Sequence, residues 1–142
     1  MKKYIPKFVF KVYHYVLAFL GALIYGFPSK KIKVIGITGT NGKSTTVNIC
    51  AKVLEEGGFK VATMSSILFK IKDKERVNDL KMTMPGRFKI QAFLKEAVLE
   101  GCDFAIIEVT SEGVEQFRHK FIQFDVAIMT NLSKEHIEAH GG

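Results

Sequence analysis

The sequence predicts an α/β fold: a P-loop-containing parallel sheet flanked by helices and preceded by a hydrophobic N-terminal helix. A β-branched run at 34–38 gives way to a glycine-rich stretch at 39–42 and then to helical spacing at 46–56. Further apolar segments of strand length alternate with helical segments, which favours a parallel sheet with helices on both faces. An apolar, aromatic run at 8–27 comes first, so we expect two units, residues 1–30 and 31–142.

The glycine-rich stretch predicts a cradle for the phosphates of ATP. A strand, a glycine loop and a helix N-terminus direct backbone N–H groups and a partial positive charge at an anion. Lys43 would reach the β- and γ-phosphates, and the Ser44 hydroxyl would ligate Mg²⁺. The residues expected to bind the nucleotide are Gly39, Thr40, Asn41, Gly42, Lys43, Ser44 and Thr45.

One spacing in this stretch departs from the general P-loop pattern. G-x-x-x-x-G-K-[ST] requires glycine where Ile37 stands, and Gly36 lies one residue too early. The simpler alternative is a glycine-rich turn between a strand and a helix. The Gly-Lys-Ser-Thr run in a strand–turn–helix context favours the phosphate cradle.

Charge and length restrict the classes of function. The 142 residues suffice for one domain with a real core, and 47% hydrophobic residues exclude a disordered chain. Much of the net charge of +7 lies before the glycine loop, at Lys2, Lys3, Lys7, Lys11, Lys30, Lys31 and Lys33. A basic, aromatic N-terminus favours an anionic membrane surface. Nucleic acid is not an expected partner, because no recognition motif accompanies the charge.

The apolar run at 8–27 has three interpretations. It can be a single membrane-spanning helix, a helix lying in the membrane interface, or a helix packed on its own domain or on a partner. We predict that residues 1–30 associate with a membrane, without choosing between spanning and lying flat. A cleaved signal peptide is not expected, because the run lacks a small-x-small cleavage site.

The remaining elements follow in order. Residues 60–65 predict a second strand, 67–75 a surface hairpin, 82–86 a loop and 87–100 a helix that ends at Gly101. Residues 104–108 predict a buried strand, 125–130 another apolar strand, and 131–140 a loop and the start of a helix. We expect Cys50 and Cys102 to be free, mostly buried thiols in a reducing compartment.

Two features suggest metal ligands. Glu108 ends an apolar strand, as does the acid that faces Mg²⁺ beside a P-loop, although an ordinary strand-end glutamate is the alternative. His136 and His140 are four residues apart and would share a helix face. Without further context, that pair is better explained as a solvated surface.

The loop Gly-Ile-Thr-Gly-Thr-Asn-Gly-Lys-Ser-Thr resembles the ATP loop of the Mur ligases and of their relatives, the folylpolyglutamate and cyanophycin synthetases. Three further stretches resemble Mur ligase motifs in the same order. They are Thr83-Met84-Pro85, the segment at 108–118 that begins Glu-Val-Thr-Ser, and the segment at 130–141 that begins Thr-Asn-Leu. The resemblance covers residues from about 33 to the end and is greatest to the type that adds the third residue to the UDP-muramoyl dipeptide.

The resemblance implies roles for the matching residues. Lys43, Glu108 and His136 would be catalytic, and Ser44, Glu108 and His136 would hold Mg²⁺. The substrate contacts would be Thr83, Met84, Thr110, Gln116 and Arg118. Met84 stands where the family has threonine, and Glu112 where it has histidine, so the contacts at these two positions differ from the family pattern.

The implied function is ATP-dependent amide ligation in peptidoglycan precursor synthesis, through an acyl phosphate. ATP and Mg²⁺ would be the cofactors, with a UDP-muramoyl peptide and an amino acid as substrates. The protein would be cytoplasmic, with residues 1–30 attaching it to the inner face of the membrane. The alternatives are a membrane-tethered ATP-binding module without ligase activity, or a ligase of the folylpolyglutamate or cyanophycin synthetase type.

Two family domains have no counterpart in the 142 residues. Family members begin with a domain that binds the UDP moiety and end with one that delivers the amino acid. The family's carbamylated lysine would also lie beyond Gly142. We therefore expect a central domain that is incomplete at its C-terminus, that binds nucleotide, and that forms no amide bond alone. The identity of the added amino acid does not follow from this sequence.

Overall fold

A computed structural model describes residues 6–65, 68–72, 74–77, 87–110 and 119–131. Its helices are α1 (Lys7–Ile24), the short 3₁₀ helix η1 (Pro28–Lys31), α2 (Lys43–Glu56) and α3 (Arg87–Leu99). Its strands are β1 (Lys33–Thr38), β2 (Val61–Met64), β3 (Leu68–Ile71), β4 (Lys74–Val77), β5 (Phe104–Glu108) and β6 (Val126–Met129). The predicted strand at 104–108 is confirmed residue for residue, and the other helices and strands of the described ranges lie within a few residues of their predicted ends. The predicted loop at 82–86 and nearly all of the predicted loop and helix start at 131–140 lie outside the described residues.

The described strands form one six-stranded sheet in the order β4-β3-β2-β5-β1-β6. β2, β5, β1 and β6 are parallel, as predicted. β3 and β4 are antiparallel to their neighbours, so the sheet is mixed, and the hairpin predicted at 67–75 forms this edge. The reason is the length of the connections, because parallel pairing requires a crossover of a dozen or more residues and these links are much shorter.

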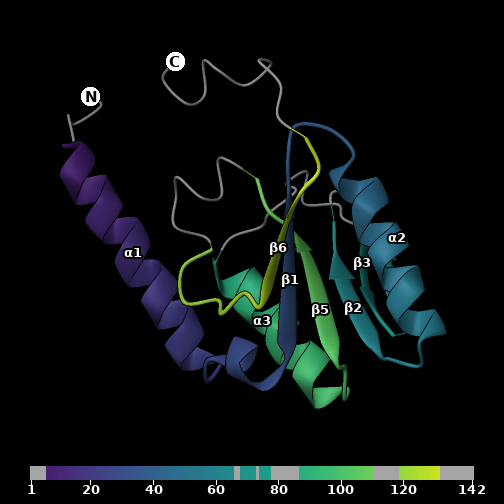
Figure 1. Ribbon diagram of the computed structural model, residues 1–142. Coiled ribbons are helices and arrows are strands. Elements are labelled where there is room, and N and C mark those ends of the chain that lie inside the picture. Colours follow the sequence, from purple (N-terminus) through teal and green to yellow (C-terminus); the bar gives the residue numbers. More distant parts are fainter. Residues whose placement is uncertain (1–5, 66–67, 73, 78–86, 111–118, 132–142) are drawn as a thin grey trace.

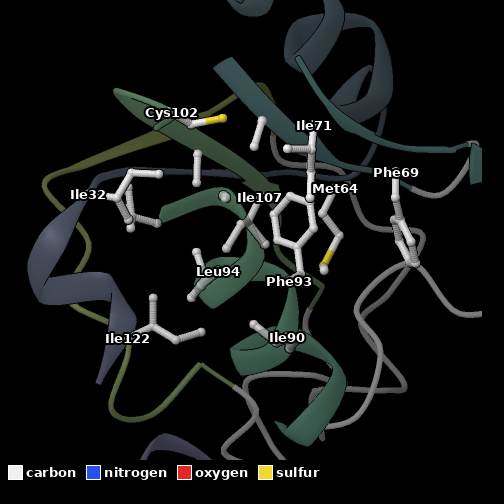
Figure 2. Packing of buried hydrophobic residues seen from close by; sticks show 14 residues of the cluster. Ile32, Met64, Phe69, Ile71, Ile90, Phe93, Leu94, Cys102, Ile107 and Ile122 are labelled. Carbon is white, nitrogen blue, oxygen red and sulfur yellow. The ribbon is translucent and has the colours of Figure 1, made fainter. Parts of the chain in front are cut away.

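Helices cover both faces of the sheet, with α2 on one face and α3 on the other (Figure 1). The core on the α3 side includes Ile90, Phe93 and Leu94 of the helix, together with Met64 and Ile107 of the sheet (Figure 2). The smaller core on the α2 side joins Val47 and Ala51 to alternate residues of β1 and β5. This period-2 alternation is what a strand buried on both faces requires.

The predicted surface hairpin is a hairpin, but it is not only a surface feature. Phe69 and Ile71 of β3 are buried in the core on the α3 side, and the Phe69 ring lies 6.2 Å from that of Phe93. The pair β3–β4 therefore extends the sheet and its core at the edge opposite β6.

The apolar N-terminal segment forms α1, which packs against α3 through three small residues, Ala18, Gly21 and Ala22. The helix ends earlier than predicted, because the chain turns at Gly26 and Phe27, which both have positive φ. Pro28 then begins η1, which leads directly into β1. In Figure 1, α1 lies along the side of the domain. It is the one helix, among the described residues, with the length and composition to cross a membrane.

Candidate functional site

The phosphate loop connects β1 to α2 and has the backbone that the glycines make possible. Gly39 has φ of 138° and Gly42, the N-cap of α2, has φ of 80°. No side chain caps the helix at Gly42, and no acidic residue lies in its first turn. The helix begins at Lys43, so the backbone N–H groups at its start and its partial positive charge face the loop. This arrangement fits an anion.

Lys43 lies where a phosphate-binding lysine is expected. Its Nζ donates a hydrogen bond to the carbonyl oxygen of Gly39 at 2.9 Å and lies 3.5 Å from that of Thr40. The ammonium group is thereby held over the loop rather than extended into solvent.

Ser44, in the first turn of α2, meets Glu108 at the end of β5. The Ser44 hydroxyl donates a hydrogen bond of 2.9 Å to Oε2 of Glu108, whose residue is only 2% exposed. β5 pairs with β1, with Glu108 opposite Ile37, so the strand register itself brings the carboxylate beside the loop. A hydroxyl and a carboxylate are the hard oxygen ligands that Mg²⁺ prefers, with water and phosphate oxygens completing its shell. The residues present therefore fit the metal.

The end of β6 holds the phosphate loop in place. Oδ1 of Asn131 accepts hydrogen bonds from the backbone N–H groups of Thr40 at 3.0 Å and Asn41 at 2.9 Å. The Thr130 hydroxyl donates to the carbonyl oxygen of Asn41 at 2.7 Å, and the Thr130 N–H donates to Thr38. Thr130 also occupies the space that a side chain at Gly39 would need.

Sequence reasoning did not assign this role to Thr130 and Asn131. The available signal was a polar Thr-Asn pair directly after an apolar strand. That signal becomes specific only when β6 is known to lie beside β1.

Several predicted site residues lie outside the described part of the chain, namely Thr83, Met84, Gln116, Arg118 and His136. Thr110 is described and half-buried, two residues beyond Glu108. Within the described ranges, no three His, Cys, Asp or Glu side chains cluster as a metal site. Within these ranges, the candidate metal ligands are therefore Ser44 and Glu108. A hollow lined by Phe69, Ile71, Lys74, Glu75 and Glu96 lies at the opposite edge of the sheet and shares no residue with the loop.

The comparisons with known proteins agree with this geometry. The sequence profile described as the Mur ligase middle domain matches residues 37–142, which include the loop, Glu108 and Asn131. The chain belongs to the Mur ligase family. A UDP-N-acetylmuramyl-tripeptide synthetase of Roseiflexus sp. (strain RS-1) is 35% identical over 127 residues, covering 88% of this chain and 25% of that protein.

A UDP-N-acetylmuramoyl-L-alanyl-D-glutamate--2,6-diaminopimelate ligase of Syntrophomonas wolfei is 37% identical over 124 residues, 87% of this chain and 25% of that ligase. A solved structure of such a ligase matches with a TM-score of 0.67 at 27% identity, over 75% of this chain and 21% of that one. E. coli FolC, in complex with DHPP and ADP, shares the fold, with a TM-score of 0.66 at 22% identity over 88% of this chain and 35% of that chain. This Mur ligase middle domain thus spans about a quarter of the length of the curated relatives above.

Proposed function

We propose that this domain binds ATP with Mg²⁺ and that the protein to which it contributes is an amide ligase of peptidoglycan precursor synthesis. The observation that supports this best is the hydrogen bond between Ser44 and Glu108 beside a loop with no side-chain cap. The relatives above are named for UDP-N-acetylmuramoyl peptide ligation, which indicates a UDP-muramoyl peptide and an amino acid as substrates.

In the proposed reaction, a carboxylate oxygen of the peptide attacks the γ-phosphorus of ATP, and the bond to the ADP oxygen breaks. The products of this step are an acyl phosphate and ADP. The amine nitrogen of the amino acid then attacks the acyl carbon, phosphate leaves, and the nitrogen loses a proton. The energy of ATP hydrolysis is in this way conserved in an amide bond.

The residues of this chain position and neutralise the phosphates. The N–H groups of the loop and the ammonium group of Lys43 would bind the β- and γ-phosphate oxygens, and Ser44 and Glu108 would hold Mg²⁺. The metal would supply charge neutralisation on the phosphate oxygens. The substrate and metal contacts that the resemblance implies for Thr83, Met84, Thr110, Gln116, Arg118 and His136 belong to the same proposal.

The binding step is tested by calorimetry on the 142-residue chain with a non-hydrolysable ATP analogue and Mg²⁺. Lys43→Ala should abolish the measured binding, because the ammonium group contacts the phosphates directly. Lys52→Ala is the matched control, since Lys52 is an exposed lysine of the same helix. Unchanged affinity in Lys43→Ala would rule this site out.

The ligation step is tested with the whole protein that includes this domain. It is incubated with ATP, Mg²⁺, a UDP-muramoyl dipeptide and a mixture of amino acids, and mass spectrometry looks for a tripeptide product that disappears in Lys43→Ala. Nucleotide binding without product would instead favour the ATP-binding module without ligase activity. A product formed only from another carboxylate substrate would favour a folylpolyglutamate or cyanophycin synthetase type.

In the same assay, the 142-residue chain alone should bind nucleotide and give no product. Holding two reactants in line can contribute about 7–11 kcal/mol to a reaction of this kind. The proposal assigns the holding of the amine to a part of the protein outside these residues. Product formation by the 142-residue chain would show that this division of roles is wrong.

We also propose that the protein acts in the cytoplasm and that residues 1–30 attach it to the inner face of the membrane. The support is the apolar helix α1 and the lysines on both sides of it. A fusion of residues 1–30 to a soluble reporter should sediment with membranes. A reporter that stays in the supernatant would support the alternative of a helix that only packs on protein.

A further inference from the structure

Two opposite faces of α1 differ in what they contact. On one face, Ala18 and Ala22 are at most 1% exposed and pack, with Gly21, against the side of the domain that contains α3. The Tyr15 and Phe19 rings flank this face and lie 5.2 and 5.4 Å from the ring of Phe121. The helix is therefore docked on its own domain along its C-terminal half.

The opposite face is an exposed apolar stripe, which none of the residues that the structure describes covers. It consists of Val9, Val12, Val16, Leu20 and Leu23. These residues recur at spacings of three and four, so they lie on one side of the helix. Each is between 39% and 52% exposed. We call these five residues the outward stripe. A helix that is apolar on both sides is normally buried on both sides, so the outward stripe predicts a second apolar neighbour.

The charges around α1 indicate what that neighbour is. No Asp or Glu occurs before Glu55, whereas Lys7, Lys11, Lys30 and Lys31 are all exposed. Lys7 and Lys11 share the side of Ala18 and Ala22, because the successive separations of four, seven and four residues correspond to whole turns of the helix. Lys7 and Lys11 thus lie on the side of α1 opposite the outward stripe, and Lys30 and Lys31 lie in η1, just beyond its C-terminal end. Helices that lie in a membrane interface likewise have lysines on the side opposite the apolar one.

A second copy of the chain is a poor match for this surface. Pairing two outward stripes would bring two helices of the same positive charge alongside each other, with no acidic residue in either to compensate. An anionic bilayer offers both an apolar layer and negative charge, and each lysine near such a surface contributes about 1 kcal/mol to binding.

We propose that α1 lies flat in the headgroup region of an anionic bilayer, with the outward stripe inserted and the domain on the aqueous side. The proposal rests on the membrane attachment proposed above and is independent of the ligase activity. The sequence alone did not distinguish a spanning helix from one lying flat, and the proposal chooses the flat orientation.

Spanning conflicts with the contacts of α1. A helix of 18 residues is about 27 Å long, slightly short of a hydrocarbon core of about 30 Å. To span, it would have to leave α3 and Phe121, which would expose the buried surface beneath Ala18 and Ala22. Lying flat keeps every one of these contacts and covers the outward stripe.

This orientation leaves the nucleotide site open. In Figure 1, α1 runs along the side of the sheet, and the loop between β1 and α2 lies at one end of the sheet. A bilayer against the outward stripe therefore runs alongside the strands and does not cover the end at which ATP would enter.

The test uses tryptophan, which the chain lacks. Three variants of the 142-residue chain, Val9→Trp, Val16→Trp and Leu23→Trp, place one tryptophan near each end of the outward stripe and one in its middle. Val53→Trp, on the exposed side of α2, is the control. Each is mixed with vesicles of phosphatidylglycerol and phosphatidylcholine, or of phosphatidylcholine alone. Lipids brominated at different depths then quench the fluorescence. Unchanged nucleotide-analogue affinity verifies that each variant is folded.

A flat helix gives a blue shift in all three α1 variants on anionic vesicles, with quenching at one shared, shallow depth. The shift weakens with added salt and is absent in Val53→Trp. A spanning helix would instead place Val16→Trp about 10 Å deeper than Val9→Trp, which keeps the attachment and overturns the orientation. No shift in any α1 variant would contradict both the membrane attachment and the flat orientation. Equal binding to vesicles of phosphatidylcholine alone would contradict the proposal that the bilayer must be anionic.

Discussion

The Ser44 hydroxyl and the Glu108 carboxylate form a hydrogen bond of 2.9 Å across 64 residues of sequence. This contact joins the phosphate loop to the end of the neighbouring strand. We predict that Glu108→Gln removes most of the effect of Mg²⁺ on binding of an ATP analogue. Glutamine keeps the shape and an oxygen acceptor for Ser44 but lacks the charge that holds a divalent cation.

The measurement is calorimetry with and without Mg²⁺. We expect the metal to improve wild-type affinity at least tenfold, or about 1.4 kcal/mol, and to have little effect in the variant. Glu55→Gln is the control, because Glu55 is a glutamate of α2 that pairs with Lys70 away from the loop. An equal response to Mg²⁺ in wild type and Glu108→Gln would exclude Glu108 as a metal ligand.

Asn131 should act on nucleotide binding by positioning the loop. Asn131→Ala removes the acceptor of two loop N–H groups, and we expect it to weaken binding of the analogue by about tenfold. Asn131→Asp keeps both acceptors but places a negative charge beside the phosphates. Its loss of affinity should therefore depend on salt, whereas that of Asn131→Ala should not.

Thermal unfolding of both Asn131 variants separates this role from a general structural one. Asn131→Asp should unfold near the wild-type temperature while binding more weakly. If both variants bound the analogue as wild type does, the contact would have no part in nucleotide binding.

Gly36 is required for packing rather than for phosphate binding. A Cβ at this position would lie 2.9 Å from two ring atoms of Phe124. We expect Gly36→Ala to lower the free energy of unfolding by about 1–3 kcal/mol, the usual cost of overpacking. Adding Phe124→Leu should recover part of this loss in urea denaturation. Additive losses in the double variant would show that the two positions are not coupled.

Cys102 should make the domain less stable in alkali. Burial raises the pKa of the Cys102 thiol, and Asp103 and Glu100 add to the rise, which Lys72 and Lys60 only partly oppose. The folded state therefore holds this proton more tightly than the unfolded state. Its contribution to stability is complete below the ordinary thiol pKa of about 8.5 and is lost as pH rises toward the higher folded pKa. Urea denaturation between pH 7 and pH 10 should show a steeper loss for wild type than for Cys102→Ala. Parallel curves would contradict this.

Local sequence patterns were sufficient for most elements of the fold. Neighbouring residues alone predict a strand or a helix in such segments. Examples are the apolar runs at 34–38 and 104–108 and the helical spacing at 87–100. The antiparallel edge was foreseen only as a hairpin, because whether a hairpin joins the main sheet depends on distant contacts such as that of Phe69 with Phe93. The C-terminal end of α1 was predicted too late in the chain. The apolar run continues through Phe27, and an apolar pattern does not reveal that Phe27 has a left-handed backbone, which ends the helix before it.

The candidate site was predictable where the functional residues form a local sequence motif. Lys43, Ser44 and Glu108 follow from residue types at fixed places relative to strands, and the structure brings them together. The role of Asn131 was not predictable in this way. It depends on β6 lying beside β1, which is a property of strand order rather than of local sequence.

That strand order also determines when the nucleotide site can form during synthesis. β1 and its loop are made early, but β1 lies between β5 and β6, the two last strands of the described sheet. Glu108 and Asn131 are translated 64 and 90 residues after their partners in the loop. Bringing such distant segments together costs chain entropy, and the contacts that offset this cost form only afterwards. On the ribosome, we therefore expect α1 and its apolar stripe to be exposed well before the domain can bind ATP.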